Sequence, residues 1–261
     1  MNAPQQIRRI AVLVSIGRHP VSGATRYSRN DAAALEIGLA LADKHRAQLA
    51  VLHAGDATEP ALAEYLALGA REVEVLACGA ADDAARTLAA RVKDYDLVLT
   101  GTRAEGAYDT GMLPYHVAAA LGRPLLGAAV DVDIAEGRVT VRQFLPKGLR
   151  RRVEAVLPAV VAVHPLANVQ PRFAYARLRA GVIRTAPAAR FADANAATWT
   201  LGAAERKPVR LAAAEKRSGH ARMLSATTTE SRGGNVVNGG TSVEKAQVIL
   251  AYLREHQLID Y

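Results

Sequence analysis

The stretch that decides the fold runs from IAVLVSI (residues 10–16) through a helical pattern at residues 31–46 to LAVLH (residues 49–53). The two apolar runs have the length of buried strands, and the segment between them carries apolar residues at helical spacing. Two strands joined by such a helix need a crossover connection, which makes them parallel neighbours in a sheet. The chain therefore begins with a predicted β-α-β unit.

The same alternation continues as far as residue 100. We expect a helix at Ala61–Leu68 with Gly69 as its C-cap, and a strand at Glu72–Ala77. A second helix is predicted at Asp82–Lys93, and a strand at Asp96–Thr100. Strands and helices in this order are typical of a doubly wound α/β fold, in which helices cover both faces of a parallel sheet.

Beyond Leu121 the apolar runs follow one another with only turns between them. The runs are Leu125–Asp133, Arg138–Phe144, Arg151–Leu157 and Pro158–His164. Glu136-Gly137 is a turn signal, and so is Pro146-Lys147-Gly148. We therefore expect hairpins to replace crossovers here and to form an antiparallel extension of the sheet.

The domain division is predicted at residue 165. Residues 1–165 would form the α/β domain with its antiparallel extension, and residues 166–261 an extended arm that ends in a C-terminal docking helix. Between about Leu166 and Gly240 there is little apolar periodicity, which is typical of an arm that lies on a partner. Thr241-Ser242-Val243-Glu244 is a capping pattern that opens an amphipathic helix at residues 244–256.

Composition narrows the classes of protein. Half of the 261 residues are apolar, enough for a full core, and the apolar run near the start is too short to span a bilayer. We therefore expect a cytoplasmic protein without membrane insertion. The single cysteine, Cys78, excludes an intramolecular disulfide and a multi-cysteine metal site, and we expect no metal.

The net charge of +8 favours an anionic ligand or an acidic protein partner. The basic residues are spread along the chain, apart from the compact run at Arg150–Arg152, and no nucleic-acid motif accompanies them. We expect no binding to nucleic acid.

Catalytic motifs are missing from the sequence. The turn after the first strand is Ser15-Ile16-Gly17-Arg18, which is not a dinucleotide-binding glycine pattern, and there is no phosphate-binding loop of the Walker type, nucleophile elbow or His-x-x-x-His pair. A nicotinamide dehydrogenase, a P-loop enzyme and a serine hydrolase are disfavoured. These motifs therefore predict no catalytic residue.

What remains is the set of strand ends, where open α/β sheets bind ligands. Small residues at Val14-Ser15, at residues 53–56 and at residues 100–102 allow backbone amides to approach a ligand, but turns need small residues as well. The loop at residues 101–112 favours the ligand interpretation because it is long. Its Asp109-Thr110-Gly111 could present amides and a hydroxyl to a phosphate at a helix start.

Several motifs in order resemble the electron transfer flavoprotein beta subunit family over most of the chain. They are the first strand, an Asn-led helix at Asn30, LALGA (residues 66–70), DLVLTG (residues 96–101), DTG (residues 109–111), LPAVV (residues 157–161), PRFA (residues 171–174) and the C-terminal helix. Each motif is moderately specific, and their common order and spacing are highly specific.

The resemblance implies an adenine-nucleotide-binding type of α/β fold that buries one AMP as a structural ligand. FAD would lie mainly on an alpha subunit, with this chain covering part of it. The chain itself would be an electron carrier subunit and not an enzyme. The heterodimer would carry electrons from a flavin-containing dehydrogenase to a membrane quinone oxidoreductase. By position, the resemblance assigns the AMP pocket to Val14, Ser15, Asn30, Ala54, Gly55, Gly101, Asp109, Thr110 and Gly111.

The resemblance also places a partner-docking loop at about Pro171–Gly181. Arg172 and Phe173 lie at its base, and we expect Arg172 to hold the loop through backbone carbonyls. Strict alignment puts the hydrophobic anchor at Ala176, whereas we favour Leu178.

The chain departs from the family pattern at three places. Ser15 stands where the family commonly has lysine, and Asn30-Asp31 replaces an Asn-Pro pair, so that Asn30 is equally a candidate helix N-cap. The acidic hairpin of the family becomes basic at Arg142–Gly148.

The alternative is a stand-alone adenine-nucleotide-binding stress or signalling protein of the same broad fold, which would bind ATP as a homodimer. A stand-alone protein has little use for the long arm, so the sequence favours the subunit.

Overall fold

The computed structural model describes residues 6–19, 21–105, 110–194, 196–198, 200, 202, 218–220, 223, 237–256 and 258–259. The chain divides into two compact units, Met1–Trp199 and Thr200–Tyr261. Each unit is described by itself.

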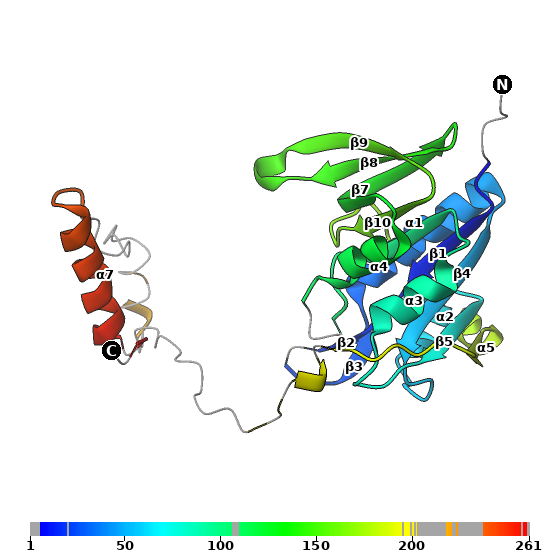
Figure 1. Cartoon of the computed structure of the whole chain (residues 1–261), viewed down its shortest axis with the longest axis horizontal. Helices are drawn as coiled ribbons and strands as arrows, with labels where there is room; N and C mark the ends of the chain where they lie inside the picture. Colours follow the sequence, from blue (N-terminus) through cyan, green and yellow to red (C-terminus); the bar gives the residue numbers. More distant parts are fainter. Residues whose placement is uncertain are drawn as a thin grey trace. The chain divides into compact units, whose positions relative to one another are not determined.

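The first unit is built on a nine-stranded sheet in the order β11-β5-β4-β1-β6-β10-β7-β8-β9 (Figure 1). Neighbours from β11 to β7 are parallel, and β7, β8 and β9 are antiparallel. The strands are β1 (Arg9–Leu13), β4 (Gln48–Gly55), β5 (Glu72–Ala77), β6 (Leu97–Gly101), β7 (Leu125–Ala135), β8 (Arg138–Phe144), β9 (Arg150–Val156), β10 (Ala159–Val163) and β11 (Val182–Ala186).

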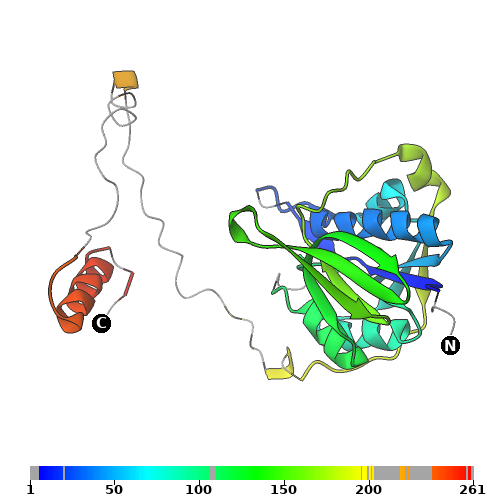
Figure 2. The same cartoon turned by 90° about the horizontal axis from the view of Figure 1, so that it is seen from above.

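Helices cover both faces of the parallel part of the sheet. On one face Ile10 and Val12 of β1 share a core cluster with residues of α1 and α2, and on the other Ala11 and Leu13 share a second cluster with residues of α3 and α4. Figure 2 shows α1 and the pair α3 and α4 on opposite sides of the strands. The helices of this unit are α1 (Arg29–His45), α2 (Leu62–Leu68), α3 (Ala84–Val92), α4 (Leu113–Leu121) and α5 (Tyr175–Ala180), with 3₁₀ turns at Pro146–Gly148 and Ala196–Thr198. The predicted doubly wound α/β fold with an antiparallel extension is confirmed.

Two helix ends show how local sequence sets these bounds. Ser28 caps α1, because its side chain accepts the N–H of Asp31, so the expectation of an N-cap at Asn30 is wrong. Asn30 is instead a buried residue of the first turn. Gly69 ends α2 with a φ of 125°, a conformation open to glycine, and the predicted C-cap is confirmed.

The predicted hairpin between β9 and β10 is wrong. β10 pairs in parallel with β6 and β7 and lies in the interior of the sheet. All five residues of β10 are buried, which is typical of a parallel strand covered on both faces. β9 carries exposed arginines and forms the edge.

The first strand is shorter than predicted. β1 ends at Leu13, and a small antiparallel pair follows, β2 (Ile16–Arg18) and β3 (Thr25–Tyr27). The sequence analysis missed this hairpin because its strands are only three residues long and show no clear alternation.

The segment assigned to the arm begins with ordered elements that the sequence analysis missed. α5 lies against α2, and β11 pairs in parallel with β5 at the edge of the sheet. β11 has no fully buried residue, so its apolar periodicity is weak. The compact unit therefore extends to Trp199, whereas the functional division at residue 165 stays a prediction.

The second unit contains α7 (Ser242–Glu255), which opens with a capping box between Thr241 and Glu244 as predicted. Within the described ranges, no helix combines the length and the apolar character needed to cross a membrane. The same residues contain no group of three or more His, Cys, Asp or Glu side chains placed to hold a metal ion.

Candidate functional site

The candidate site lies where the strand order reverses. The chain passes from β1 to β4 and β5 on one side and then returns to β6 on the other side of β1. Open α/β sheets bind ligands at the carboxyl ends of the strands beside such a reversal. Three residues of the predicted pocket, Val14, Ser15 and Gly101, lie here, and Ala54 and Gly55 end the adjacent strand β4.

Asp31 joins the two strand ends at the reversal. Its carboxylate, 3% exposed, accepts the Ser15 N–H at 2.8 Å, the Ser15 hydroxyl at 2.6 Å and the Gly101 N–H at 3.0 Å. The sequence analysis did not assign Asp31 to the site. The one available signal was that it replaces the second residue of the Asn-Pro pair of the resembled family.

These hydrogen bonds change the interpretation of the small residues. The amides of Ser15 and Gly101 already donate to Asp31, so they are not free for a ligand. A Cβ at Gly101 would collide with Oδ1 of Asp31 and lie 2.6 Å from the Cβ of Asn30. Glycine at this strand end therefore makes room for the start of α1.

Burial raises the pKa values of two titratable groups in this network, Asp31 and Tyr65. Burial raises the pKa of Asp31 to about 7, although its hydrogen bonds with Ser15, Gly101 and Ser28 favour the ionised form. Burial also raises the pKa of Tyr65 well above its usual value, so its hydroxyl keeps its proton at neutral pH. That hydroxyl donates to the Ser15 carbonyl at 2.6 Å and accepts the Ser28 N–H at 2.9 Å.

Near the end of β4, His53 binds a backbone carbonyl, as Tyr65 does at Ser15. Its buried ring bonds through Nδ1 to the Val14 carbonyl at 2.9 Å, and because a carbonyl only accepts, Nδ1 carries the hydrogen. Burial lowers the pKa of His53, so the ring is neutral at neutral pH. A Cβ at Gly55 would lie 2.5 Å from Nε2 of His53, so Gly55 makes room for this ring.

The loop that follows β6 is held by the β2–β3 hairpin. Arg26 of β3 forms an ion pair with Glu105 at 3.3 Å, and the Glu105 carboxylate occupies the space where a Cβ of Gly17 would lie. The hairpin that the sequence analysis missed therefore fixes the first part of the predicted phosphate loop.

The end of the same loop leads into α4. The Thr110 hydroxyl accepts the Met112 N–H at 3.3 Å, and Gly111 has a φ of 71°, which favours glycine. Asp109 lies outside the described residues. The structure therefore brings Val14, Ser15, Asn30 and Gly101 together, while their role toward a ligand stays a prediction.

The predicted docking loop lies on and before α5. Arg172 and Ala176 are exposed, Phe173 is 56% exposed, and Leu178 is only half-buried. No hydrogen bond of the Arg172 side chain to a backbone carbonyl is found in the described part of the chain. Arg177 reaches one instead, the Leu68 carbonyl at 3.4 Å.

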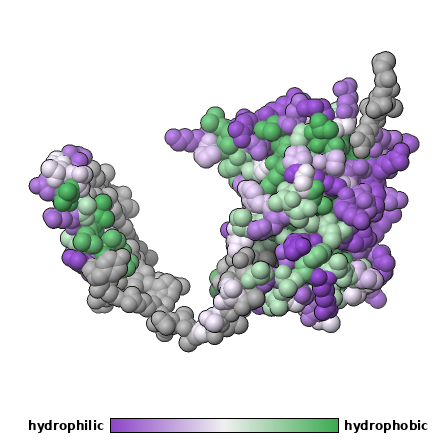
Figure 3. Space-filling view, viewed as in Figure 1, coloured by the Kyte–Doolittle hydropathy of each residue, from purple (hydrophilic) through white to green (hydrophobic). Residues whose placement is uncertain are grey.

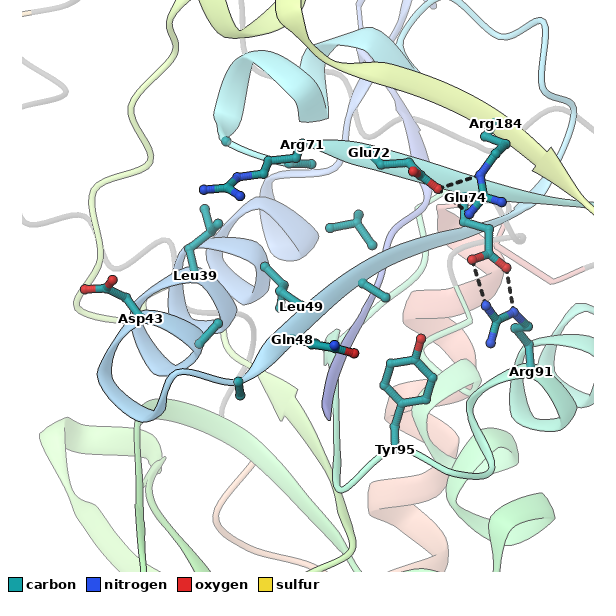
Figure 4. A pocket seen from close by; sticks show the side chains of 16 residues that line it. Leu39, Asp43, Gln48, Leu49, Arg71, Glu72, Glu74, Arg91, Tyr95 and Arg184 are labelled. Carbon is teal, nitrogen blue, oxygen red and sulfur yellow. Dashed lines mark hydrogen bonds and ion pairs between the residues drawn. The ribbon is translucent and has the colours of Figure 1, made fainter. Parts of the chain in front are cut away.

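Two cavities lie away from the point where the strand order reverses. The larger, of about 770 Å³, is at the amino ends of β4 and β5, opposite to the candidate site (Figure 4). Four of its charged side chains form two ion pairs: Arg91 binds Glu74 at 2.6 and 2.9 Å, and Arg184 pairs with Glu72 at 2.6 Å. Asp43 and Arg71 line the same cavity outside these two pairs. The smaller cavity, of about 290 Å³, adjoins the carboxyl ends of β6 and β10.

Comparison with known proteins identifies the class to which this fold belongs. The electron transfer flavoprotein domain family model matches residues 22–198. The chain is also 35% identical over 257 residues to the electron transfer flavoprotein subunit beta of Chromohalobacter salexigens, covering 96% of this chain and 95% of that protein.

The chain belongs to the electron transfer flavoprotein beta subunit family. The match extends over nearly the whole length of both chains, so the resemblance stated from the motifs is confirmed. It supports a function in electron transfer.

Proposed function

We propose that this chain pairs with an alpha subunit to form an electron transfer flavoprotein, which binds one AMP as a structural ligand and encloses FAD between the subunits. The single observation that carries the AMP site is the reversal of strand order between β1 and β6, together with membership of the family. The electron donor is a flavin-containing dehydrogenase and the acceptor a membrane quinone oxidoreductase. FAD, held mainly by the alpha subunit, supplies the redox chemistry, and this chain catalyses no bond change.

The residues at the reversal of strand order fit AMP, but they restrict how the bound AMP can be oriented. Because Asp31 already binds the amides of Ser15 and Gly101 and carries negative charge when ionised, the phosphate would be repelled there. The start of α4 suits the phosphate better, since Thr110 and Gly111 precede a helix without an acidic residue in its first turn. Pro114 lacks an N–H, and the Met112 N–H is bonded to Thr110, so the amides of Leu113 and Tyr115 would bind the phosphate. Ala54 and Gly55 are half-buried at the end of β4, and they would contact the nucleoside part.

The remaining residues would fix the backbone around the bound AMP. Tyr65 and His53 fix the backbone carbonyls of Ser15 and Val14, and Arg26 fixes the loop through Glu105. AMP bound only to the folded chain would stabilise it by mass action.

Co-expression with an alpha-type subunit tests the proposal. We expect a complex with one copy of each subunit that releases one FAD and one AMP on denaturation, as identified by mass spectrometry. Two flavins without AMP would overturn the pocket assignment. A homodimer of this chain that binds ATP and ignores the alpha subunit would overturn the function and support the stand-alone alternative.

A further inference from the structure

The larger cavity, at the amino ends of β4 and β5, has no part in the function proposed above. Its volume of about 770 Å³ lies in the range of small-molecule sites. Its walls come mainly from the C-terminal turns of α1, the turn after α2 and the first residues of β4 and β5. Because this edge of the sheet is opposite to the predicted AMP pocket, a ligand bound here would leave that pocket free.

The sheet divides the lining of the cavity into two sides. Val73 of β5 belongs to the core cluster on the α1 face, so by strand alternation Glu72 and Glu74 point to the α3 face. There they form their ion pairs with Arg184 and Arg91. The side of the cavity on the α1 face carries none of these paired charges, and we call it the α1 side.

The α1 side has an apolar floor. Leu39 and Leu49 are half-buried and pack against the core cluster of this face. A Cβ at Gly69 would lie 2.8 Å from Cδ1 of Leu39, and a Cβ at Gly38 would lie 3.2 Å from Cδ1 of Leu49, so each leucine packs closely against a glycine. Small apolar residues complete this side, namely Ala42, Ala47 and Ala70. The surface of the first unit near the start of β1 is otherwise largely hydrophilic (Figure 3).

Two charged side chains lie at the rim of the α1 side. Asp43 and Arg71 are both exposed, and among the described residues neither side chain has an ion-pair or hydrogen-bond partner. Figure 4 shows them at one end of the cavity, with Leu39 between them. The α1 side therefore presents a carboxylate and a guanidinium above an apolar floor, without net charge.

Asp43 lies where a helix disfavours an acidic residue. It is in the last turn of α1, where the helix dipole is negative and the other charged residues are basic. The adjacent Lys44 binds Asp133 at 2.6 Å instead. Residues that oppose a local preference in this way are expected mainly at functional sites, and a positively charged group of a ligand would remove the conflict.

We propose that the α1 side of this cavity binds a free α-amino acid with an apolar side chain, whose carboxylate pairs with Arg71 and whose ammonium group pairs with Asp43. The side chain of the ligand would lie on the apolar floor and be removed from water. The guanidinium of arginine matches a carboxylate through two parallel hydrogen bonds. The inference does not rest on the proposed function, because it uses residues of the opposite edge of the sheet.

A nucleotide or a free phosphate fits the α1 side less well than an amino acid. Both α1 and α2 end beside the cavity, and the C-terminus of a helix repels an anion. A neutral apolar molecule would leave Asp43 and Arg71 without partners. Exposed charges also keep a protein soluble, and the test separates that role from binding.

Calorimetric titration of the full chain with L-leucine tests the proposal. We expect saturable binding at one site, with a Kd below about 1 mM. Isocaproate has the same carbon skeleton without the ammonium group, and isoamylamine lacks the carboxylate. Each analogue should bind about tenfold more weakly or worse, because one charged hydrogen-bonding partner is lost. Equal binding of all three molecules would overturn the proposal, since the cavity would then accept any apolar molecule.

Two variants test the residues. Asp43→Asn and Arg71→Gln should each weaken the binding of L-leucine by about tenfold or more. Asp43→Asn should at the same time keep or raise the thermal stability, because it removes an acidic group from the C-terminal turn of α1. The matched controls are Asp94→Asn and Arg46→Gln, which remove the same charges from exposed residues outside the lining of the cavity and should bind L-leucine as the wild type does.

Three results would overturn the amino-acid site. The first is the absence of saturable binding at millimolar L-leucine, and the second is an equal loss of binding in the variants and in their controls. The third is binding of inorganic phosphate that Arg71→Gln abolishes and Asp43→Asn strengthens, which would assign the cavity to an anion instead.

Discussion

Asp31 and Gly101 share one small volume at the reversal of strand order. The Oδ1 atom of Asp31 accepts the N–H of Gly101 at 3.0 Å and sits where a Cβ at position 101 would have to lie. The contact joins the first turn of α1 to the last residue of β6. The same carboxylate binds Ser15, which follows β1, so Asp31 ties the helix to the ends of both central strands.

Gly101→Ala should therefore lower the free energy of unfolding by about 1–3 kcal/mol, the usual cost of overpacking a buried site. Urea denaturation followed by circular dichroism would measure the change. The control is Gly127→Ala in β7, where a Cβ meets nothing within 4 Å, and it should change stability little. Equal stability of both variants would show that the Asp31 contact yields without cost.

Asp31→Asn should change how stability depends on pH. The pKa of Asp31 is raised to about 7, so between about pH 4 and pH 7 the folded chain binds more protons at this group than the unfolded chain. Its contribution to stability is full below pH 4 and is lost as the pH rises toward 7. Relative to Asp31→Asn, the wild-type free energy of unfolding should fall by up to about 1.4 kcal/mol per pH unit in that window.

The matched control for this titration is Asp56→Asn. Hydrogen bonds from Thr58 lower the pKa of the exposed Asp56 carboxyl, so it is ionised in both states above pH 5 and should add no slope there. Urea titrations at pH 5, 6, 7 and 8 give the comparison. Parallel pH profiles for wild type and Asp31→Asn would mean that Asp31 keeps one charge state throughout.

The sequence predicted those elements whose own apolar pattern shows which of their faces is buried. The β5 strand and the α2 helix lie where the apolar pattern placed them, because each contributes one continuous buried face. β10 was misassigned because its position between β6 and β7 depends on strands far from it in sequence. Asp31 was missed for the same reason, since its contact with Gly101 spans 70 residues. Local patterns therefore predicted the layers, and only the packed structure revealed which groups hold the crevice.

The predicted phosphate loop can be tested at Gly111. Replacing it with alanine or valine strains a backbone whose φ is 71° and adds bulk beside the Thr102 carbonyl, so AMP retention in the purified complex should fall severalfold. Gly23→Ala is a strict control, because Gly23 has the same φ of 71° and open space around it. Undiminished AMP in the Gly111 variants, measured by mass spectrometry, would place the phosphate in another loop.

The docking loop offers the last prediction, which rests on the proposed function. Phe173 is 56% exposed, whereas Leu178 is half-buried on α5, which packs against α2. An exposed aromatic side chain is the better anchor for a partner. Phe173→Ala should slow reduction of the purified complex by its dehydrogenase, by an amount equivalent to roughly 1–3 kcal/mol of binding, without change in flavin content or stability. Leu178→Ala should instead lower the thermal stability through lost packing.

Rates measured over a range of dehydrogenase concentrations separate the possible anchors. Slower transfer by Leu178→Ala at unchanged stability would favour the anchor predicted from the sequence. Slower transfer by Ala176→Asp alone would favour the strict alignment. Because all three positions lie within six residues of one another on the same loop, a defect shared equally by the three variants would mean that the loop docks as one surface and has no single anchor.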